Sequence, residues 1–224
     1  MLKAVIFGLE GVLLADGGEI IPRMLRLLGS RLTSSAGSDE TASALWKAGR
    51  AVSENDGSVS CEDRFWSVLA EQLGGRIQLE RVAAEELIKS ELPALAAGAH
   101  PIPYAEQMLS GLRMFGIKTA LAPDPMLSET AVRLCLEGAG LKADGFSLIA
   151  HSGNTRFGKR RSEYYTELAR MLDVPPGDCL AVGDESDLAA ETAGMRLFRY
   201  DKNGGFMLLE YITDLLVQER GEPK

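Results

Sequence analysis

Short apolar runs at intervals along the chain predict buried strands. Residues 3–7 form a β-branched and aromatic run that leads into glycine-containing sequence, as expected for a buried parallel strand followed by a loop. In the second half of the chain, similar runs alternate with segments of helical periodicity. The strand-like runs lie at 118–122, 145–150, 179–182 and 197–200, and the helical segments at 104–115, 127–138, 162–172 and 188–193. This alternation predicts an α/β protein with a doubly wound parallel, Rossmann-like sheet.

Between about residues 20 and 97 the pattern is helical throughout. Apolar residues recur at three-to-four spacing, with no convincing strand among them, in the segments 23–32, 40–53, 61–73 and 79–92. Asp39 and Ser60 are suitable N-cap residues for the helices that follow them. We therefore predict an inserted α-helical domain, residues 16–97, within a core domain made of residues 1–15 and 98–224.

The composition is that of a globular protein, because 46% of the 224 residues are hydrophobic and 25% are charged. The net charge of −8 disfavours binding to nucleic acids or to anionic membranes, since both attract clusters of Lys and Arg. The best basic cluster, residues 159–161, is short. We therefore expect neither partner.

Three cysteines occur without metal-type spacing, which favours a reducing compartment over a disulfide framework or a zinc site. The apolar run at the N-terminus is too short for a signal peptide, and no later stretch reaches the length of a membrane span. The sequence thus predicts a cytoplasmic protein.

In an open parallel sheet, ligands bind in the crevice beyond the carboxyl ends of the strands, and four segments of this chain invite comparison with a known family. They are Phe-Gly-Leu-Glu-Gly-Val-Leu (7–13), Leu-Ala-Pro-Asp (121–124), Phe-Gly-Lys-Arg (157–160) and Val-Gly-Asp-Glu-Ser-Asp (182–187). In this order, with a helical insertion after the first, they resemble the haloacid dehalogenase (HAD) superfamily, specifically its phosphatase-like members with an α-helical cap. The resemblance covers about residues 3–200, and the ordered set is more specific than any one segment.

The resemblance implies an attacking aspartate at the tip of the first strand, in the pattern Asp-x-Asp-Gly. Here Gly8 stands at this nucleophile position and Glu10 at the position of the general acid and base. Covalent attack requires a side-chain nucleophile, and removing one can cost roughly six orders of magnitude in turnover. Taken alone, Gly8 would be an ordinary turn glycine. The other three segments give the substitution its meaning.

The second segment implies a Ser or Thr whose hydroxyl holds a phosphate oxygen. Pro123 occupies this position, with Ala122 as the nearest alternative register. Proline offers neither a side-chain donor nor a backbone N–H, and the neighbouring Asp124 would repel phosphate. We interpret this segment as a turn without a phosphate contact.

The third and fourth segments keep more of the family's chemistry. The resemblance makes Lys159 a phosphate-binding residue and makes Asp184 and Asp187 candidate ligands of Mg²⁺, which prefers oxygen ligands. Plainer interpretations are a solvated basic loop for Lys159 and helix caps for the two aspartates. Because Asp187 follows Asp184 by three residues rather than the family's four or five, the sequence supports Mg²⁺ only weakly.

Together these residues favour a HAD-like pseudoenzyme that has lost covalent phosphotransfer and keeps a crevice for a small anionic molecule or a protein partner. The alternative is a hydrolase that still acts on a small phosphorylated substrate, with water activated by Glu10. Gly8 and Pro123 argue for the first interpretation, whereas Lys159 and Asp184 keep the second one open. A purely structural or interaction protein is a third class.

Overall fold

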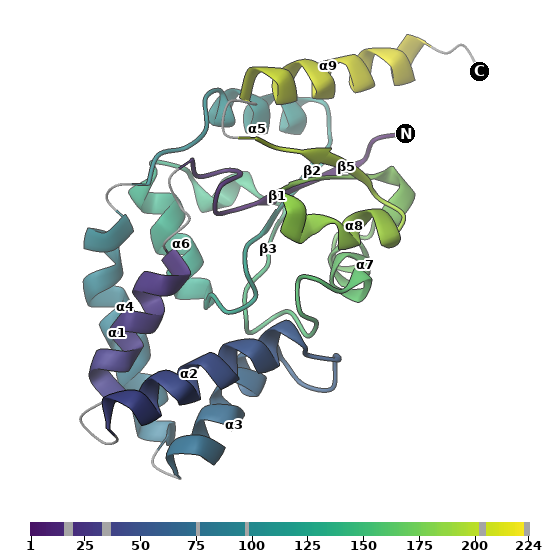
Figure 1. Cartoon of the computed structure of the whole chain (residues 1–224). Helices are drawn as coiled ribbons and strands as arrows, with labels where there is room; N and C mark the ends of the chain where they lie inside the picture. The colour runs from purple at the N-terminus through teal and green to yellow at the C-terminus, as the bar shows by residue number, and fades with distance from the viewer. Residues whose placement is uncertain (16–19, 33–36, 75–76, 97–98, 202–204, 222–224) are drawn as a thin grey trace.

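A five-stranded parallel sheet lies at the centre of the chain (Figure 1). The computed structural model describes residues 1–15, 20–32, 37–74, 77–96, 99–201 and 205–221. The strands are β1 (Ala4–Gly8), β2 (Lys118–Ala122), β3 (Leu148–Ile149), β4 (Cys179–Gly183) and β5 (Arg196–Arg199), in the order β3-β2-β1-β4-β5. β1 pairs with both β2 and β4, so the carboxyl ends of these three strands meet at one edge. The predicted Rossmann-like fold class is confirmed.

Helices cover both faces of the sheet, because alternate residues of a strand point to opposite sides. The five helices of this part are α5 (Ala105–Met114), α6 (Glu129–Gly138), α7 (Ser162–Met171), α8 (Ala189–Thr192) and α9 (Gly205–Gly221). Val5 and Phe7 belong to the core shared with α5, α6 and α9, whereas Ala4 and Ile6 belong to the core shared with α7 and α8. Figure 1 shows α7 and α8 on one side of the sheet and α5 with α9 on the other.

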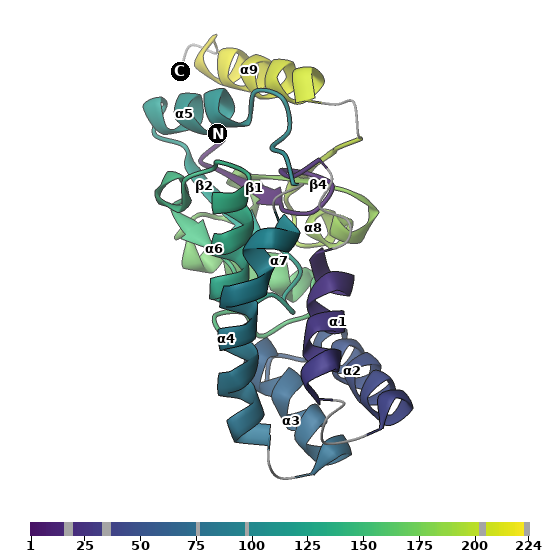
Figure 2. The same ribbon diagram turned by 90° about the vertical axis from the view of Figure 1, so that its left-hand side faces the viewer.

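The helical insertion consists of α1 (Ile20–Leu32), α2 (Ser38–Ser53), α3 (Cys61–Leu73) and α4 (Ile77–Ala96). Figure 2 shows these helices as a layer of their own beyond the sheet, with α4 running up to α6. Buried apolar side chains of α1 to α4 join the core that α6 shares with β1. The division into two domains stays a prediction. Its boundaries adjoin residues 16–19 and 97–98, which lie outside the described residues.

Backbone hydrogen bonds fasten the insertion to a loop of the core. At the start of α3, the amide of Cys61 donates to the carbonyl of Thr155 (2.8 Å), and the amide of Glu62 donates to the carbonyl of Ser152 (2.9 Å). At the end of α2, a β-carbon on Gly158 would overlap the carbonyl oxygen of Ser53. The loop that carries Lys159 is therefore hydrogen-bonded to the start of α3 and lies directly against the backbone at the end of α2.

Two predictions about local structure need correction, and one helix was missed. The strand predicted at 145–150 is shorter in the structure, where β3 is Leu148–Ile149. It is an edge strand and pairs with β2 at these two residues. The N-cap of α2 is Gly37, so Asp39 lies inside the first turn rather than before it. The helix α9 was not predicted. By contrast, Ser60 is confirmed as a cap, since its hydroxyl accepts the amide of Asp63.

In the described part of the chain, no helix is both long and apolar enough to cross a membrane.

Candidate functional site

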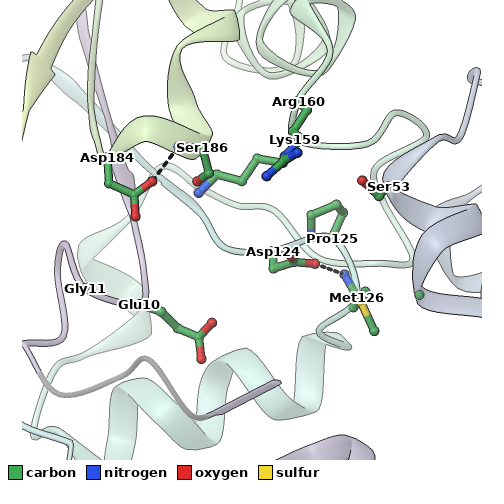
Figure 3. Close-up of a pocket in the computed structure, with 11 residues that line it drawn as sticks. Glu10, Gly11, Ser53, Asp124, Pro125, Met126, Lys159, Arg160, Asp184 and Ser186 are labelled. Atoms are coloured by element: carbon green, nitrogen blue, oxygen red, sulfur yellow. Dashed lines mark hydrogen bonds between the residues drawn. The ribbon is translucent and has the colours of Figure 1, made fainter. Parts of the chain in front are cut away.

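A pocket of about 380 Å³ lies where the carboxyl ends of β1, β2 and β4 meet helix α2 (Figure 3). It brings together three residues singled out from the sequence, namely Glu10, Lys159 and Asp184. The remaining lining residues are Gly11, Gly49, Ser53, Asp124, Pro125, Met126, Arg160 and Ser186. Gly49 and Ser53 come from the insertion, one helical turn apart on α2, so both parts of the chain build the wall.

The tip of β1 carries no reactive side chain. Gly8 is the last residue of the strand, buried and opposite Ala122 of β2. A β-carbon at this position would lie 3.0 Å from Cγ2 of Val12 and 3.5 Å from the carbonyl oxygen of Val182. This is a tight fit that requires Val12 to give way by a few tenths of an ångström.

Glu10 lines the pocket, but one of its oxygens accepts a hydrogen bond from a helix of the insertion. Its Oε1 accepts the backbone amide of Ile21, at the start of α1, over 3.3 Å. In Figure 3 the side chain extends away from Asp184. Burial, with the nearby charge of Asp124, raises the pKa of Glu10 to about 7, although the hydrogen bond to Ile21 opposes this shift.

The segment after β2 forms a turn, as predicted, and presents a carboxyl group. Pro123 is buried, and its carbonyl accepts the hydroxyl of Tyr164 (3.1 Å). Asp124 lines the pocket, and its Oδ1 accepts the amide of Met126 (2.9 Å). Burial raises the pKa of Asp124, against the effects of this hydrogen bond and of the Lys159 charge. No hydroxyl lies at the position of Pro123 or Ala122.

Lys159 is paired with a carboxylate of the protein itself. Its Nζ lies 3.0 Å from Oδ1 of Asp187, and these side chains are only 14% and 3% exposed. The same oxygen accepts the hydroxyl of Tyr165 at 2.5 Å. Asp187 Oδ2 accepts the backbone amide of Asp184 at 3.1 Å. Asp187 is thus a saturated internal acceptor that does not line the pocket. Tyr165 was missed, since nothing in the sequence marks one tyrosine of α7 over its neighbour.

Asp184 faces the pocket and begins the turn after β4. Its Oδ1 accepts the amide of Ser186 at 2.7 Å, and together with Asp187 it forms a reciprocal capping box at Glu185–Asp187. Burial acts to raise the pKa of Asp184, but hydrogen bonds from Ser186 and the charge of Lys159 outweigh burial and lower it. The prediction that these aspartates cap the helix at 188–193 is wrong, because Leu188 is the N-cap of α8 and caps it without a side-chain hydrogen bond. Asp184 instead caps the short 3-10 turn that ends at Asp187.

The side chains at the candidate metal site do not suit Mg²⁺. Asp184 lines the pocket, although its Oδ1 accepts the amide of Ser186. Gly8 has no carboxylate, and Asp187 is occupied by Lys159 and Tyr165. The ammonium group of Lys159 also places a positive charge beside the turn. Within the described ranges, no group of three His, Cys, Asp or Glu residues could hold a metal ion.

Comparisons with known proteins agree with this fold. A model of haloacid dehalogenase-like hydrolases matches residues 2–191. The structure of CbbY from Rhodobacter sphaeroides in complex with phosphate is similar, with a TM-score of 0.59 and 22% identity over 90% of this chain and 87% of that one. A HAD phosphatase from Thermococcus onnurineus gives a TM-score of 0.56 and 21% identity over 91% of this chain and 88% of that one.

A putative β-phosphoglucomutase from Thermotoga maritima gives a TM-score of 0.55 and 19% identity over 94% of this chain and all of that one. At such identities these structures support the fold alone. None of the curated proteins compared with the chain matches it. The family model spans most of the chain. This protein belongs to the haloacid dehalogenase-like hydrolase family.

Proposed function

We propose that this protein does not carry out the family's covalent phosphotransfer, and that its pocket binds a small anionic ligand. The observation that carries the proposal is the tip of β1, where Gly8 offers no side-chain atom to attack phosphorus. Covalent catalysis needs a nucleophile in line with the leaving group. Without that step, the pocket is left with a binding role.

The state of Lys159 supports the loss of turnover. A lysine that serves a phosphoryl group has to offer its charge to the ligand, but Asp187 already neutralises this one at 3.0 Å. Releasing the ammonium group would leave Asp187 as an unpaired buried carboxylate, which is costly. The pocket's cation for an incoming anion is thus Arg160, which is exposed and lines the wall.

The acidic residues of the pocket are compatible with anion binding. Burial raises the pKa values of both Glu10 and Asp124, so both groups hold their protons more readily than exposed carboxyl groups do. Protonation lowers the negative charge that an anion would meet. We therefore expect anion binding to strengthen as the pH falls toward 6.

A second candidate function rests on Glu10. A carboxyl group with a pKa of about 7 that faces the pocket is suited to general base catalysis near neutral pH. In this case the protein would hydrolyse a small phosphorylated substrate by direct attack of water.

The deciding experiment is a p-nitrophenyl phosphate assay, with and without Mg²⁺, on the natural chain and on Gly8→Asp and Gly8→Asp/Pro123→Thr. Gly8→Ala serves as the control for the tight fit against Val12. We expect no turnover by the natural chain above that of heat-denatured protein, and a gain only in the variants that carry aspartate. Turnover by the natural chain that disappears in Glu10→Gln would establish the second candidate instead.

A further inference from the structure

A second pocket lies on the other side of the segment that carries Lys159. It has a volume of about 330 Å³ and is lined by Gly57, Arg156, Phe157, Glu163, Thr166, Glu167 and Arg170. We call it the outer pocket. Phe157 lines the outer pocket and Lys159 lines the first one, with Gly158 between them, so one short segment separates the two.

Helix α7 supplies one wall of the outer pocket. Glu163, Thr166, Glu167 and Arg170 follow each other at spacings of three, one and three residues, which puts them on one face of the helix. The loop with Arg156 and Phe157 and, from the insertion, Gly57 supply the rest of the lining. A molecule in this pocket would therefore touch both the core and the insertion.

The acids and the bases of the outer pocket differ in their pairing. Glu163 accepts hydrogen bonds from Arg161 (2.8 Å) and from Ser162 (3.2 Å). Glu167 is buried, with 7% of its surface exposed, and its Oε2 accepts the backbone amide of Arg156 at 3.0 Å. The acidic groups are thus already engaged by the protein.

The two arginines are not engaged. Arg156 and Arg170 are exposed, and in the described part of the chain neither guanidinium group has a hydrogen-bond or ion-pair partner. Two unpaired guanidinium groups on one concavity stand out in a protein with a net charge of −8. A guanidinium group offers a planar set of donors that matches the oxygens of a phosphate.

The ring of Phe157 gives the outer pocket an apolar surface in a fixed position. Gly57 has a φ of +92°, and a β-carbon there would overlap this ring, so the ring lies directly on the glycine backbone. Asp56 and Phe157 also form a β-bridge that holds the loop. An apolar or aromatic group can lie on this ring while a charged group reaches the arginines.

We propose that the outer pocket binds a small phosphate ester with an apolar or aromatic group, its phosphate held by Arg156 and Arg170 and its apolar part lying on Phe157. This site is separate from the first pocket. It requires no nucleophile, metal or turnover, and therefore does not depend on the function proposed above.

Calorimetric titration with phenylphosphonate, which cannot be hydrolysed, tests the proposal on the full chain. We expect saturable binding that weakens with rising salt. It should weaken about tenfold in Arg156→Gln or Arg170→Gln and about a hundredfold in the double variant. Arg133→Gln, which removes one charge from an exposed pair with Glu129, is the matched control and should bind within about twofold of the natural chain.

Arg160→Gln separates the two pockets, because Arg160 lines only the first one. Full affinity in this variant, together with weakened binding in the outer-pocket variants, supports the proposal. In the Arg160→Gln chain, which lacks the cation of the first pocket, binding that survives the added double substitution or an absence of saturable binding would each overturn it.

Discussion

Lys159 and Asp187 form an ion pair of 3.0 Å from which water is almost excluded. The carboxylate is saturated, since Tyr165 and the amide of Asp184 also donate to it, and a β-carbon on Gly183 would overlap its side chain. A buried ion pair repays the cost of desolvation only where such additional hydrogen bonds complete it. The pair therefore fixes the Lys159 side chain as part of the structure.

Removing one partner should be far more damaging than removing both. We expect Asp187→Asn to lower the free energy of unfolding by about 3 kcal/mol, because Lys159 would keep a poorly solvated charge without a counterion. The double variant Lys159→Met/Asp187→Asn should recover much of this loss. Urea unfolding measures both effects, with Glu129→Gln in an exposed pair as the control that changes stability by less than about 1 kcal/mol. An Asp187→Asn protein as stable as this control would show that the pair is not structural.

Glu10 should make stability fall as the pH rises. Its folded pKa of about 7 lies above the reference value of 4.5, so between these values the folded chain binds more protons than the unfolded chain. The free energy of unfolding then decreases with rising pH, by up to about 3 kcal/mol once the pH passes 7. Glu10→Gln should remove this decrease, because the amide has no charge to bury and can still accept from Ile21.

Unfolding curves of the natural chain, Glu10→Gln and the exposed-site control Glu71→Gln between pH 4.5 and 8 test this expectation. Only Glu10→Gln should flatten the pH dependence. An equal slope in all three proteins would contradict the buried, raised state of Glu10.

Gly158 should be intolerant of any side chain. A β-carbon there would overlap the carbonyl oxygen of Ser53, and backbone cannot move aside as a flexible side chain can. We expect Gly158→Ala to cost about 2–3 kcal/mol and to loosen the insertion. Hydrogen exchange at the amides of Cys61 and Glu62, which donate to the same loop, should then become faster.

The matched control for this substitution is Gly111→Ala. Gly111 lies inside α5, and apart from its chain neighbours and the backbone of its own helix no atom lies within 4 Å of its missing β-carbon. Alanine is favoured over glycine in a helix by about 1 kcal/mol, so this change should stabilise the protein. Equal effects of the two substitutions would mean that the insertion does not press on Gly158.

Much of the fold could be predicted from the sequence because hydrophobic periodicity is a local property. The helix at Cys61–Leu73 and the strand at Lys118–Ala122 match their predicted bounds. Helix α9 was missed, and exposed apolar residues obscure its periodic pattern: Phe206 and Met207 are exposed, whereas Leu208 is buried.

The candidate site could be predicted only in part. Parallel strands bring their carboxyl ends together, so the meeting of Glu10, Lys159 and Asp184 followed from the fold class. The pairing of Lys159 with Asp187 did not, because it joins two segments far apart in the sequence. The rotation of α7 sends Tyr165 to Asp187 and the adjacent Tyr164 to a backbone carbonyl, and no local sequence pattern distinguishes the two tyrosines.

Mg²⁺ should bind weakly to the natural chain and more tightly to Gly8→Asp. The pocket offers Mg²⁺ one carboxylate at the turn after β4, Asp184, and the ammonium group of Lys159 lies close to this turn. A second carboxylate at the tip of β1 would supply another oxygen ligand opposite this turn. Calorimetry should therefore show no saturable heat for the natural chain at millimolar Mg²⁺, and a measurable affinity for Gly8→Asp. Adding Asp184→Asn to Gly8→Asp should remove this affinity, whereas adding the exposed-site control Asp144→Asn should leave it intact. Tight binding by the natural chain that is lost in Asp184→Asn would instead restore a metal to this pocket, and with it the case for hydrolysis.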